Sequence, residues 1–313
     1  MSRPTSRSSL LAAVLVAASL GGCDRGDAAR EEGPRLAGRP DSGAAWEIVY
    51  DLEIGDNTDL FVISSSDATP RRLTRDPAYD GMPRFTPDGE TIIFSSKRTA
   101  QWQLFEIPAG GGRVRRIRAN AATEYQADPS PDGKSLAFLT NLDGPERLVV
   151  LDRARGTLRE LVRHGRKTIF GNPSWSPDGR EIVFSSNWRI GHQIYVVDVA
   201  SGEVRRISPI ASGGCEPRFT RDGRRVCYVS RGHLRRTSRL VTHDLATGEE
   251  EVLVDWPAMN YDPALSPDGT EIAFASDVSG AFAIYRQRLS DGRAWRVTHG
   301  PGEARYPDYR PKR

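Results

Sequence analysis

Residues 172–184 read NPSWSPDGREIVF and contain the pattern that decides the fold. A short strand leads into SPDG at 176–179, and an apolar run, IVF, follows at 182–184. Proline fixes φ at the first corner of a turn, and glycine accepts the positive φ that closes it. Because β-branched and aromatic residues favour strands, the segment predicts two antiparallel strands joined by a tight turn.

The same pattern occurs five times at a nearly constant spacing. The copies are MPRFTPDGETIIF (82–94), QADPSPDGKSLAF (126–138), NPSWSPDGREIVF (172–184), EPRFTRDGRRVCY (216–228) and DPALSPDGTEIAF (262–274). Their Asp-Gly pairs, which we interpret as structural turns, are Asp88-Gly89, Asp132-Gly133, Asp178-Gly179, Asp222-Gly223 and Asp268-Gly269. The pairs are 44, 46, 44 and 46 residues apart. Self-similar units at such a period indicate a repeat architecture.

Each unit contains four short strands. After the hairpin, a third strand is expected at 193–197 and a fourth at 204–207. Four strands in a unit of this length form one blade of a β-propeller. The fourth strands carry arginine pairs, and charge on an outermost strand discourages edge-to-edge pairing.

The two chain ends supply a sixth blade. Residues 46–73 match second, third and fourth strands without a first, and residues 306–312 match a first strand with nothing after it. Lys312 lies 44 residues after Asp268, in phase with the repeats. We therefore expect an all-β, six-bladed β-propeller over residues 46–313, closed by N- and C-terminal strands that share one blade.

The N-terminus has the pattern of an export signal. Two arginines precede an apolar run of 11 residues at 10–20. The run is too short to span a bilayer as a helix, which needs ~20 residues, but it suits a signal peptide. Its ending, LGGC at 20–23, resembles the lipobox of bacterial lipoproteins, which implies cleavage before Cys23 and lipidation of its thiol.

This interpretation divides the N-terminal region into a signal peptide, residues 1–22, and a flexible polar tether, residues 23–45. The protein is then expected in the bacterial cell envelope, anchored by lipid and facing the periplasm. Asp24 resembles a signal that retains lipoproteins in the inner membrane. The choice between inner and outer membrane stays open.

The Pro-Asp-Gly repeats resemble the WD-like β-propeller repeats of TolB-type proteins over residues 46–313. TolB is a periplasmic protein of the Tol–Pal cell-envelope system, and its propeller binds the peptidoglycan-associated lipoprotein. The resemblance therefore implies a protein-binding propeller of the envelope. TolB also carries an α/β domain before its propeller, and here only the tether occupies that place.

Motifs of catalysis do not appear in the sequence. There is no Gly-x-Ser-x-Gly, Walker loop, His-Glu-x-x-His or paired-cysteine zinc spacing. The 44 basic and 41 acidic residues are nearly balanced, which argues against nucleic acid as the main partner. We expect no catalytic residue, cofactor or metal, and a monomer.

An enzyme is the alternative interpretation, because oligogalacturonate lyase, which is related in fold, uses a His-rich metal site in its propeller. The five histidines of this chain are dispersed between strand ends (His164, His299), loops (His192, His233) and a third strand (His243). We interpret them as scattered surface residues. A polysaccharide lyase or glycan-processing enzyme, and a periplasmic sensor of small ligands, remain the alternatives to a binding protein.

Two cysteines follow the signal region. Cys215 precedes a first strand, and Cys227 takes a small apolar position on the next strand. Packing explains Cys227. A Cys215–Cys227 disulfide is the open alternative, because the hairpin brings the two close and the exported compartment is oxidising.

The binding surface is expected where the loops that lead into the first strands converge. One equivalent position holds different residues in each repeat: Met82, Gln126, Asn172, Glu216, Asp262 and Tyr306. Because this position varies while the turns stay Pro-Asp-Gly in most repeats, we interpret it as available to a ligand. Tyrosines with acidic and amide groups suit a peptide or protein partner. The predicted partner-binding residues are Tyr125, Gln126, Asn172, Glu216, Tyr261, Asp262, Arg305 and Tyr306.

Overall fold

The computed structural model describes residues 34, 36–37, 45–142, 144–165, 167–188, 191–210, 213–231 and 237–312. They belong to one compact unit, Gly33–Arg313. The signal peptide, Cys23 and most of the tether lie outside the described residues. Among the described residues there is no helix of the length and apolarity that a membrane crossing requires.

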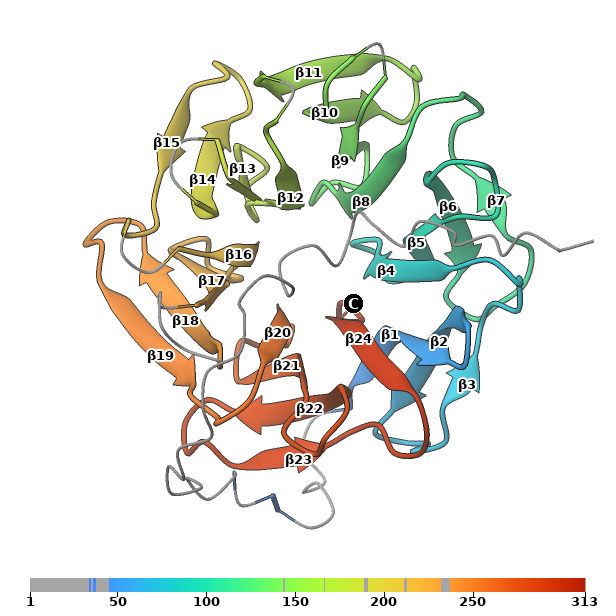
Figure 1. Cartoon of the computed structure of the whole chain (residues 1–313), viewed down its shortest axis with the longest axis vertical. Helices are drawn as coiled ribbons and strands as arrows, with labels where there is room; N and C mark the ends of the chain where they lie inside the picture. Colours follow the sequence, from blue (N-terminus) through green and yellow to red (C-terminus); the bar gives the residue numbers. More distant parts are fainter. Residues whose placement is uncertain are drawn as a thin grey trace, which may run out of the picture. The chain divides into compact units, whose positions relative to one another are not determined.

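In the described part of the chain, 24 strands form six four-stranded antiparallel blades around a central axis (Figure 1). Blade 1 is β4 (Asp80–Phe85), β5 (Thr91–Ser96), β6 (Gln103–Pro108) and β7 (Arg115–Arg116). Blade 2 is β8 (Glu124–Pro129), β9 (Ser135–Thr140), β10 (Arg147–Asp152) and β11 (Leu158–Arg163). Blade 3 is β12 (Phe170–Trp175), β13 (Glu181–Ser186), β14 (Gln193–Asp198) and β15 (Val204–Arg206). Blade 4 is β16 (Cys215–Phe219), β17 (Arg225–Ser230), β18 (Arg239–Asp244) and β19 (Glu250–Val254). Blade 5 is β20 (Asn260–Leu265), β21 (Glu271–Ser276), β22 (Ala283–Arg288) and β23 (Ala294–Arg296).

The closing blade combines both ends of the chain. Its order is β24 (Glu303–Tyr309), β1 (Glu47–Ile54), β2 (Asn57–Ser64) and β3 (Arg71–Arg72). β24 pairs antiparallel with β1, with Tyr309 opposite Ile48 and Ala304 opposite Leu52. The predicted six-bladed ring and its shared blade are confirmed.

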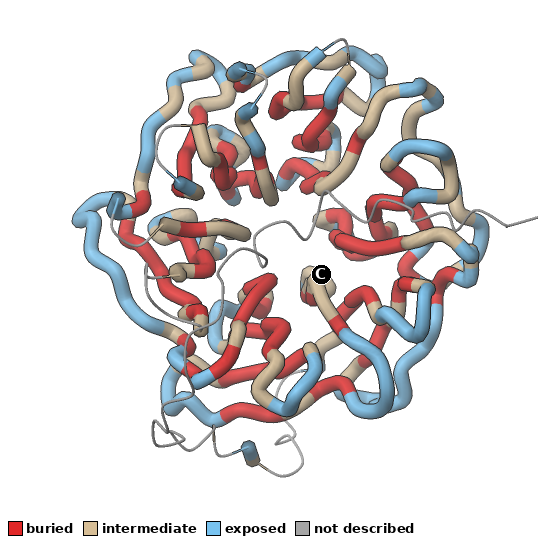
Figure 2. Tube along the Cα trace, viewed as in Figure 1, coloured by how far each residue is buried: buried red, intermediate tan, exposed pale blue. Residues whose placement is uncertain are grey.

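The core lies between neighbouring blades, and the outermost strands are the most exposed (Figure 2), except β23, in which Ala294 and Trp295 are buried. One aromatic residue at the same place on each second strand is fully buried: Tyr50, Phe94, Phe138, Phe184, Tyr228 and Phe274. Full burial of a side chain of this size stabilises the fold by roughly 1.5–3 kcal/mol. The repeat therefore contributes the same packing to every blade.

Every first strand has a β-bulge at the same place. In blade 1 the pairing with the second strand shifts register between Gly81 and Arg84, and the other five blades shift at equivalent residues. A proline lacks the N–H that a regular ladder uses, so it is accommodated where the ladder is interrupted. Blade 2 has Ala127 instead. The other five bulges contain Pro83, Pro173, Pro217, Pro263 and Pro307.

A repeated side-chain contact fastens the Asp-Gly turns. In blade 1 the Thr86 hydroxyl donates to Asp88 Oδ1 at 2.6 Å, and Gly89, with φ of 69°, donates its N–H to the Thr86 carbonyl at 2.8 Å. Hydrogen bonds from this hydroxyl and from the backbone lower the pKa of Asp88. The same hydroxyl–carboxylate bond, at 2.6–2.7 Å, joins Ser130 to Asp132, Ser176 to Asp178, Thr220 to Asp222 and Ser266 to Asp268.

Cys215 and Cys227 are both free thiols, so the disulfide that the sequence leaves open is not formed in the structure. Across the hairpin, Cys215 lies opposite Val229 and Cys227 lies opposite Arg218, on either side of the bulge. The register therefore keeps the two thiols at positions that do not face each other. Cys227 is fully buried in the apolar core, which is the packing role expected from its place in the repeat.

Candidate functional site

One residue inside each first strand, at its β-bulge, has an uncommon backbone conformation, so the variable position of the repeats lies within the strands and not in the loops before them as expected. Positive φ values between 48° and 56° occur at Met82, Gln126, Asn172, Glu216, Asp262 and Tyr306. We call these six residues the mouth ring, and the face that carries them the mouth face. The left-handed region is unfavourable for most side chains, above all for bulky ones. Contacts of the surrounding fold must therefore hold this conformation.

Side chains of the preceding blade hold these backbones in place. Gln126 Oε1 accepts the N–H of Asn172 at 2.9 Å, and Glu216 Oε2 accepts the N–H of Asp262 at 2.6 Å. Asp262 Oδ2 in turn accepts the N–H of Tyr306 at 3.3 Å. Three mouth-ring side chains thus connect neighbouring blades. Sequence variation at this position does not reveal that structural role.

Residues outside the mouth ring hold two more of its backbones. The N–H of Met82 donates to Asp51 Oδ2 at 2.9 Å, and the N–H of Gln126 donates to Ser95 Oγ at 3.0 Å. A Cβ at Gly81 would come within 2.5 Å of Asp51 Oδ2. Glycine is therefore required beside this carboxyl.

Buried and half-buried charged groups gather on one side of the mouth ring. Arg305 Nε donates to Asp262 Oδ2 at 2.6 Å, and the guanidinium lies 4.0 Å from Glu216 Oε1. Burial, followed by the nearby Asp262 carboxylate, raises the pKa of Glu216 to about 8. Burial also raises the pKa of Asp51 to about 8. Glu216 and Asp51 therefore keep their protons at neutral pH, which lowers the negative charge of the cluster.

Aromatic rings surround the Arg305 guanidinium. It lies 4.6 Å from the centre of the Phe282 ring, 5.1 Å from that of Tyr261 and 5.4 Å from that of Tyr306. Arg231 lies 5.0 Å from the Tyr261 ring and bonds the Tyr261 hydroxyl. Tyr261 is only 7% exposed, so it packs beneath the charged groups and offers little surface to a partner.

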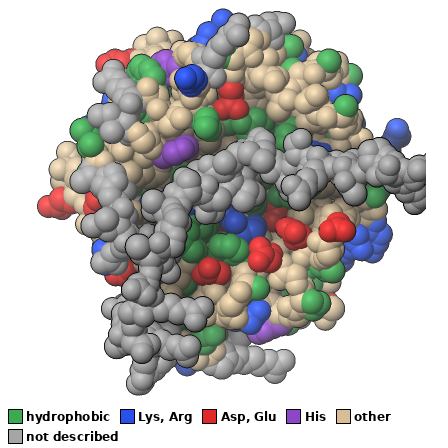
Figure 3. Space-filling view, viewed as in Figure 1, with side chains coloured by type: hydrophobic (Ala, Val, Ile, Leu, Met, Phe, Trp, Pro, Cys, Tyr) green, Lys and Arg blue, Asp and Glu red, His purple; other side chains and the backbone are tan. Residues whose placement is uncertain are grey.

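The structure divides the predicted binding residues into two groups. Blades 4 and 5 and the closing blade bring together Glu216, Tyr261, Asp262, Arg305 and Tyr306. Blades 2 and 3 carry Tyr125, Gln126 and Asn172. The Tyr125 hydroxyl donates to Glu146, so it already has a partner within its own blade. Acidic and basic side chains also gather round the centre of the face that Figure 3 shows.

A second ring of residues, which was not among the predicted site residues, lies two positions further along each first strand. We call it the inner ring. Arg84 Nε lies 3.8 Å from Asp128 Oδ1, and Arg218 Nη1 donates to Asp308 Oδ1 at 3.2 Å. The signal was the recurrence of charge two residues after the mouth ring. The inner ring consists of Arg84, Asp128, Ser174, Arg218, Ala264 and Asp308.

The inner-ring aspartates also join blades through the backbone. Asp128 Oδ2 accepts the N–H of Trp175 at 2.8 Å, and Asp308 Oδ2 accepts the N–H of Phe85 at 2.9 Å. Burial, followed by repulsion from a second arginine, lowers the pKa of Arg84 to about 10, so it stays cationic at neutral pH. The charges of the inner ring are therefore balanced among themselves and serve the closure of the ring.

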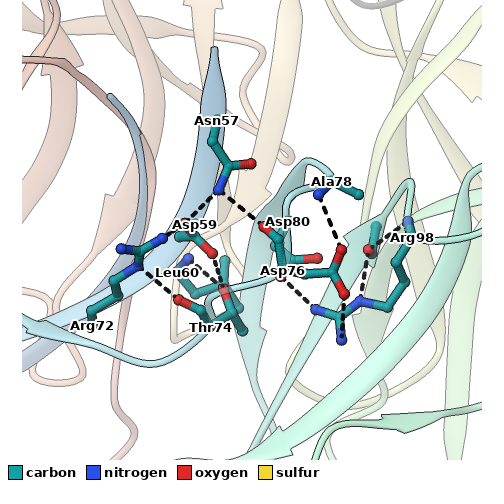
Figure 4. Close-up of polar contacts among 10 residues, drawn as sticks. Asn57, Asp59, Leu60, Arg72, Thr74, Asp76, Ala78, Asp80 and Arg98 are labelled. Atoms are coloured by element: carbon teal, nitrogen blue, oxygen red, sulfur yellow. Dashed lines mark hydrogen bonds and ion pairs between the residues drawn. The ribbon is translucent and has the colours of Figure 1, made fainter. Parts of the chain in front are cut away.

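A separate polar network ties the closing blade to blade 1 on the mouth face (Figure 4). Asp59 accepts a hydrogen bond from the Thr74 hydroxyl at 3.0 Å and pairs with Arg72. The connection is made at Asp76, whose carbonyl accepts a hydrogen bond from Asn57 Nδ2 of β2 at 2.9 Å and whose carboxylate lies 3.7 Å from Arg98 of blade 1, which also pairs with Asp80. Each charged group in these pairs has a partner of opposite sign, so the network is explained by the joining of two blades.

Within the part of the chain that the structure describes, no group of three or more His, Cys, Asp or Glu is placed to hold a metal ion. His164 and His299 follow the outer strands of opposite blades. Burial, followed by Arg231, lowers the pKa of His192. His233 lies outside the described residues.

The sequence of this chain is similar to one protein family and to several known proteins. The family described as TolB beta propeller domain matches residues 39–161 and 127–233. An uncharacterized protein of Agrobacterium fabrum is 29% identical over 127 residues, which cover 38% of this chain and 43% of that protein. The Tol-Pal system protein TolB of Bordetella pertussis is 39% identical over 54 residues, which cover 17% of this chain and 12% of that protein. The chain thus matches less than half the length of these relatives.

Solved structures share the architecture. TolB from Acinetobacter baumannii superposes with a TM-score of 0.75 at 21% identity, over 85% of this chain and 67% of that chain. Oligogalacturonate lyase in complex with manganese superposes with a TM-score of 0.58 at 14% identity, over 81% of this chain and 74% of that chain. At these identities the likeness shows the fold alone.

Proposed function

The chain belongs to the TolB beta propeller domain family, and on that premise we propose that it is a non-catalytic envelope propeller that binds a protein or peptide at the mouth ring. One relative, TolB of Bordetella pertussis, is a Tol-Pal system protein. The lipobox-like sequence ending at Cys23 supports a lipid anchor that faces the periplasm. Two or three acyl chains hold a protein on a membrane stably, whereas one chain is marginal.

The carboxylate of Asp262 is the observation that carries the proposal. Its Oδ2 accepts hydrogen bonds from Arg305 and Tyr306, whereas its buried Oδ1 accepts no N–H from the described residues, so that the protonated carboxyl of Glu216 is the one further donor beside this carboxylate. A buried acceptor without a donor costs free energy unless a ligand or water supplies the donor. A peptide N–H or an ammonium group of a partner would supply it.

The surroundings of this carboxylate suit protein recognition. Tyr306 and Arg305 are half-buried, and both residue types are common among the residues that dominate binding energy. The backbone of Tyr306 is held by the preceding blade. A surface held in this way loses little conformational entropy on binding.

No observation specifically favours the alternative of a glycan-processing enzyme. The likeness to oligogalacturonate lyase concerns the fold, and the described histidines do not converge. Catalysis therefore enters only as an outcome of the test.

The test uses the tagged mature protein to capture a partner from envelope extract, followed by measurement of the affinity of the identified partner. Tyr306→Asn removes the aromatic ring but keeps a residue that tolerates positive φ. We expect about thirtyfold weaker binding, because loss of a buried tyrosine contact typically costs ~2 kcal/mol or more. Tyr261 is a poorer choice, since its burial would mix binding with folding.

The matched control is Arg180→Ala, an exposed change beside the Asp178 turn on the opposite face. It should leave both binding and melting temperature unchanged. Unchanged affinity in Tyr306→Asn with lost affinity in Arg180→Ala would move the site to the turn face. If the purified protein turned over a glycan, the protein would be an enzyme and the proposal of a non-catalytic binding protein would be wrong.

A further inference from the structure

A pocket of about 420 Å³ lies between the closing blade and blade 5. The start of β1, the end of β2, the β20–β21 turn, β22, β23 and the end of β24 form its walls. Its volume falls in the range of small-molecule sites, roughly 300–1,000 Å³. The Asp268 turn and the end of β24 belong to the face opposite the mouth ring. The pocket is therefore separate from the proposed partner site.

Aromatic rings and guanidinium groups line this pocket together. Trp46, Trp295 and Tyr309 contribute the rings. The Arg286 guanidinium lies 4.2 Å from the centre of the Trp46 ring, and that of Arg288 lies 5.3 Å from the centre of the Trp295 ring. Such walls offer flat apolar surface next to positive charge.

Cations outnumber carboxylates among the residues that line the pocket, because the partner of one cation lies outside it. Four cationic side chains and three carboxylates line it. Each carboxylate is already paired with a cation of the pocket, and the fourth cation, Arg288, bonds Asp291 outside it at 3.1 Å. The internal pairs are Asp268 with Lys312 at 2.9 Å, Glu47 with Arg310 at 3.2 Å, and Glu271 with Arg286.

Two buried donors of the lining residues have no acceptor. Arg286 Nη1 and Trp295 Nε1 lack a hydrogen-bond partner among the described residues, and the two residues are 5% and 2% exposed. No lining residue has a buried acceptor in the same condition within that part of the chain. Unsatisfied buried donors are costly, the more so when charged. The deficit is one of acceptors, which an anion would supply.

We propose that this pocket binds a small organic anion. Its carboxylate or phosphate group accepts hydrogen bonds from Arg286 and Trp295, and its flat apolar body lies against Trp46 and Tyr309. Hydrogen bonds between a guanidinium and an anion are among the stronger ones in proteins. The inference goes beyond the proposed function, because it concerns the opposite face and a different class of ligand.

The test is isothermal titration calorimetry of the full mature protein with benzoate and phenyl phosphate, and with benzyl alcohol as the neutral probe. We expect at least one anion to bind at a single site, which identifies the carboxylate or the phosphate as the preferred group. Trp295→Phe removes the unpaired N–H but keeps an aromatic ring. Loss of a hydrogen bond to a charged group should weaken binding about tenfold or more.

The control is Trp102→Phe, the same substitution at a tryptophan outside the pocket, which is half-buried as Trp46 is and, like Trp295, has a cation near its ring, the Lys97 ammonium at 4.6 Å from the ring centre. It should bind the anion as the unmodified protein does. Trp46→Ala is the second variant, which removes an apolar wall without touching Trp295 and should also weaken binding. Three results would each overturn the proposal: no binding of either anion, equal binding of benzyl alcohol, or unchanged affinity in Trp295→Phe and Trp46→Ala.

Discussion

The carboxylate of Asp308 accepts the backbone N–H of Phe85 at 2.9 Å, across 223 positions of the chain. Asp308 lies on β24 and Phe85 at the end of β4, so this bond joins the closing blade to blade 1. The other carboxylate oxygen accepts a hydrogen bond from Arg218 of blade 4 at 3.2 Å. One side chain therefore links three blades at the place where the ring closes.

Replacing Asp308 should loosen this closure. Asp308→Ala leaves the Phe85 N–H without its acceptor and Arg218 without its partner. We expect the free energy of unfolding to fall by about 2–4 kcal/mol, as when one member of a buried polar pair is removed. Urea denaturation measures the change. Asp308→Asn keeps an acceptor and should recover part of the loss, whereas a loss in Asp308→Ala below about 0.5 kcal/mol, as for ordinary surface changes, would contradict a closing role.

The missing proline of blade 2 offers a stabilising change. Ala127 occupies the bulge position that is proline in the other five blades. It is not paired with a residue of β9 in the β8–β9 ladder. Ala127→Pro should raise the free energy of unfolding by about 0.4–1 kcal/mol, because it restricts the unfolded chain. Thermal denaturation tests this directly. Pro173→Ala is the reciprocal control and should destabilise by a similar amount; a destabilised Ala127→Pro would show that the bulge of blade 2 differs from the rest.

Stability should depend on pH through the cluster at the mouth ring. Glu216 and Asp51 hold their protons up to about pH 8 in the folded chain, whereas an unfolded chain releases them near pH 4. Between these pH values the folded state binds more protons than the unfolded state. The contribution of these two groups to the free energy of unfolding therefore falls as pH rises from about 4 to about 8. Each contributes a slope of about 1.4 kcal/mol per pH unit.

Glu216→Gln isolates this effect, because glutamine cannot ionise but its oxygen can still accept the Asp262 N–H. The fall in stability between about pH 5 and pH 8, followed by urea denaturation, should be shallower in this variant. Glu53→Gln, at an exposed residue of β1, is the control and should follow the unmodified protein. Parallel pH profiles for Glu216→Gln and the unmodified protein would mean that Glu216 is ionised in the folded state.

Cys23→Ala tests the lipid anchor. Cys23 lies at the lipobox-like ending of the signal region, and the 11-residue apolar run before it is too short to span a bilayer as a helix. The variant should move from the membrane to the soluble fraction after cell lysis and a high-salt wash. Cys215→Ala, which leaves the lipobox intact, should stay with the membrane. If Cys23→Ala stayed with the membrane after that wash, the protein would be attached by something other than a lipid on Cys23.

The repeat architecture could be predicted from local sequence because each blade folds by local rules. The Asp178-Gly179 turn is specified by four consecutive residues, and its hydroxyl–carboxylate bond forms within three of them. The phase of Lys312 relative to Asp268 then predicts the shared blade, and these two side chains form an ion pair at 2.9 Å. Period and turn chemistry were enough for the number of blades and for the way in which the ring closes.

The candidate site could be predicted only in part. The variable position of the repeats led to Glu216, Asp262 and Tyr306, which do lie next to one another. Its positive φ and the bonds from one blade to the next were not visible in the sequence, because they join residues some 44–46 positions apart. The pairing of the inner-ring charges was hidden for the same reason, although their recurrence two residues after the mouth ring is visible in the sequence.

The sequence by itself determined the number of blades, the turns between strands and the position of each strand in its blade, since these depend on contacts within one repeat. Only the tertiary structure decided which carboxyls are buried, which arginines they meet and where two blades leave a pocket. Those outcomes depend on the curvature of the ring, which brings Asp308 to Phe85 and Arg286 to Trp46. Burial then decides the protonation state of a carboxyl, because an aspartate that is ionised in water can be protonated in an apolar surrounding. A local sequence pattern does not show how deeply a side chain will be buried.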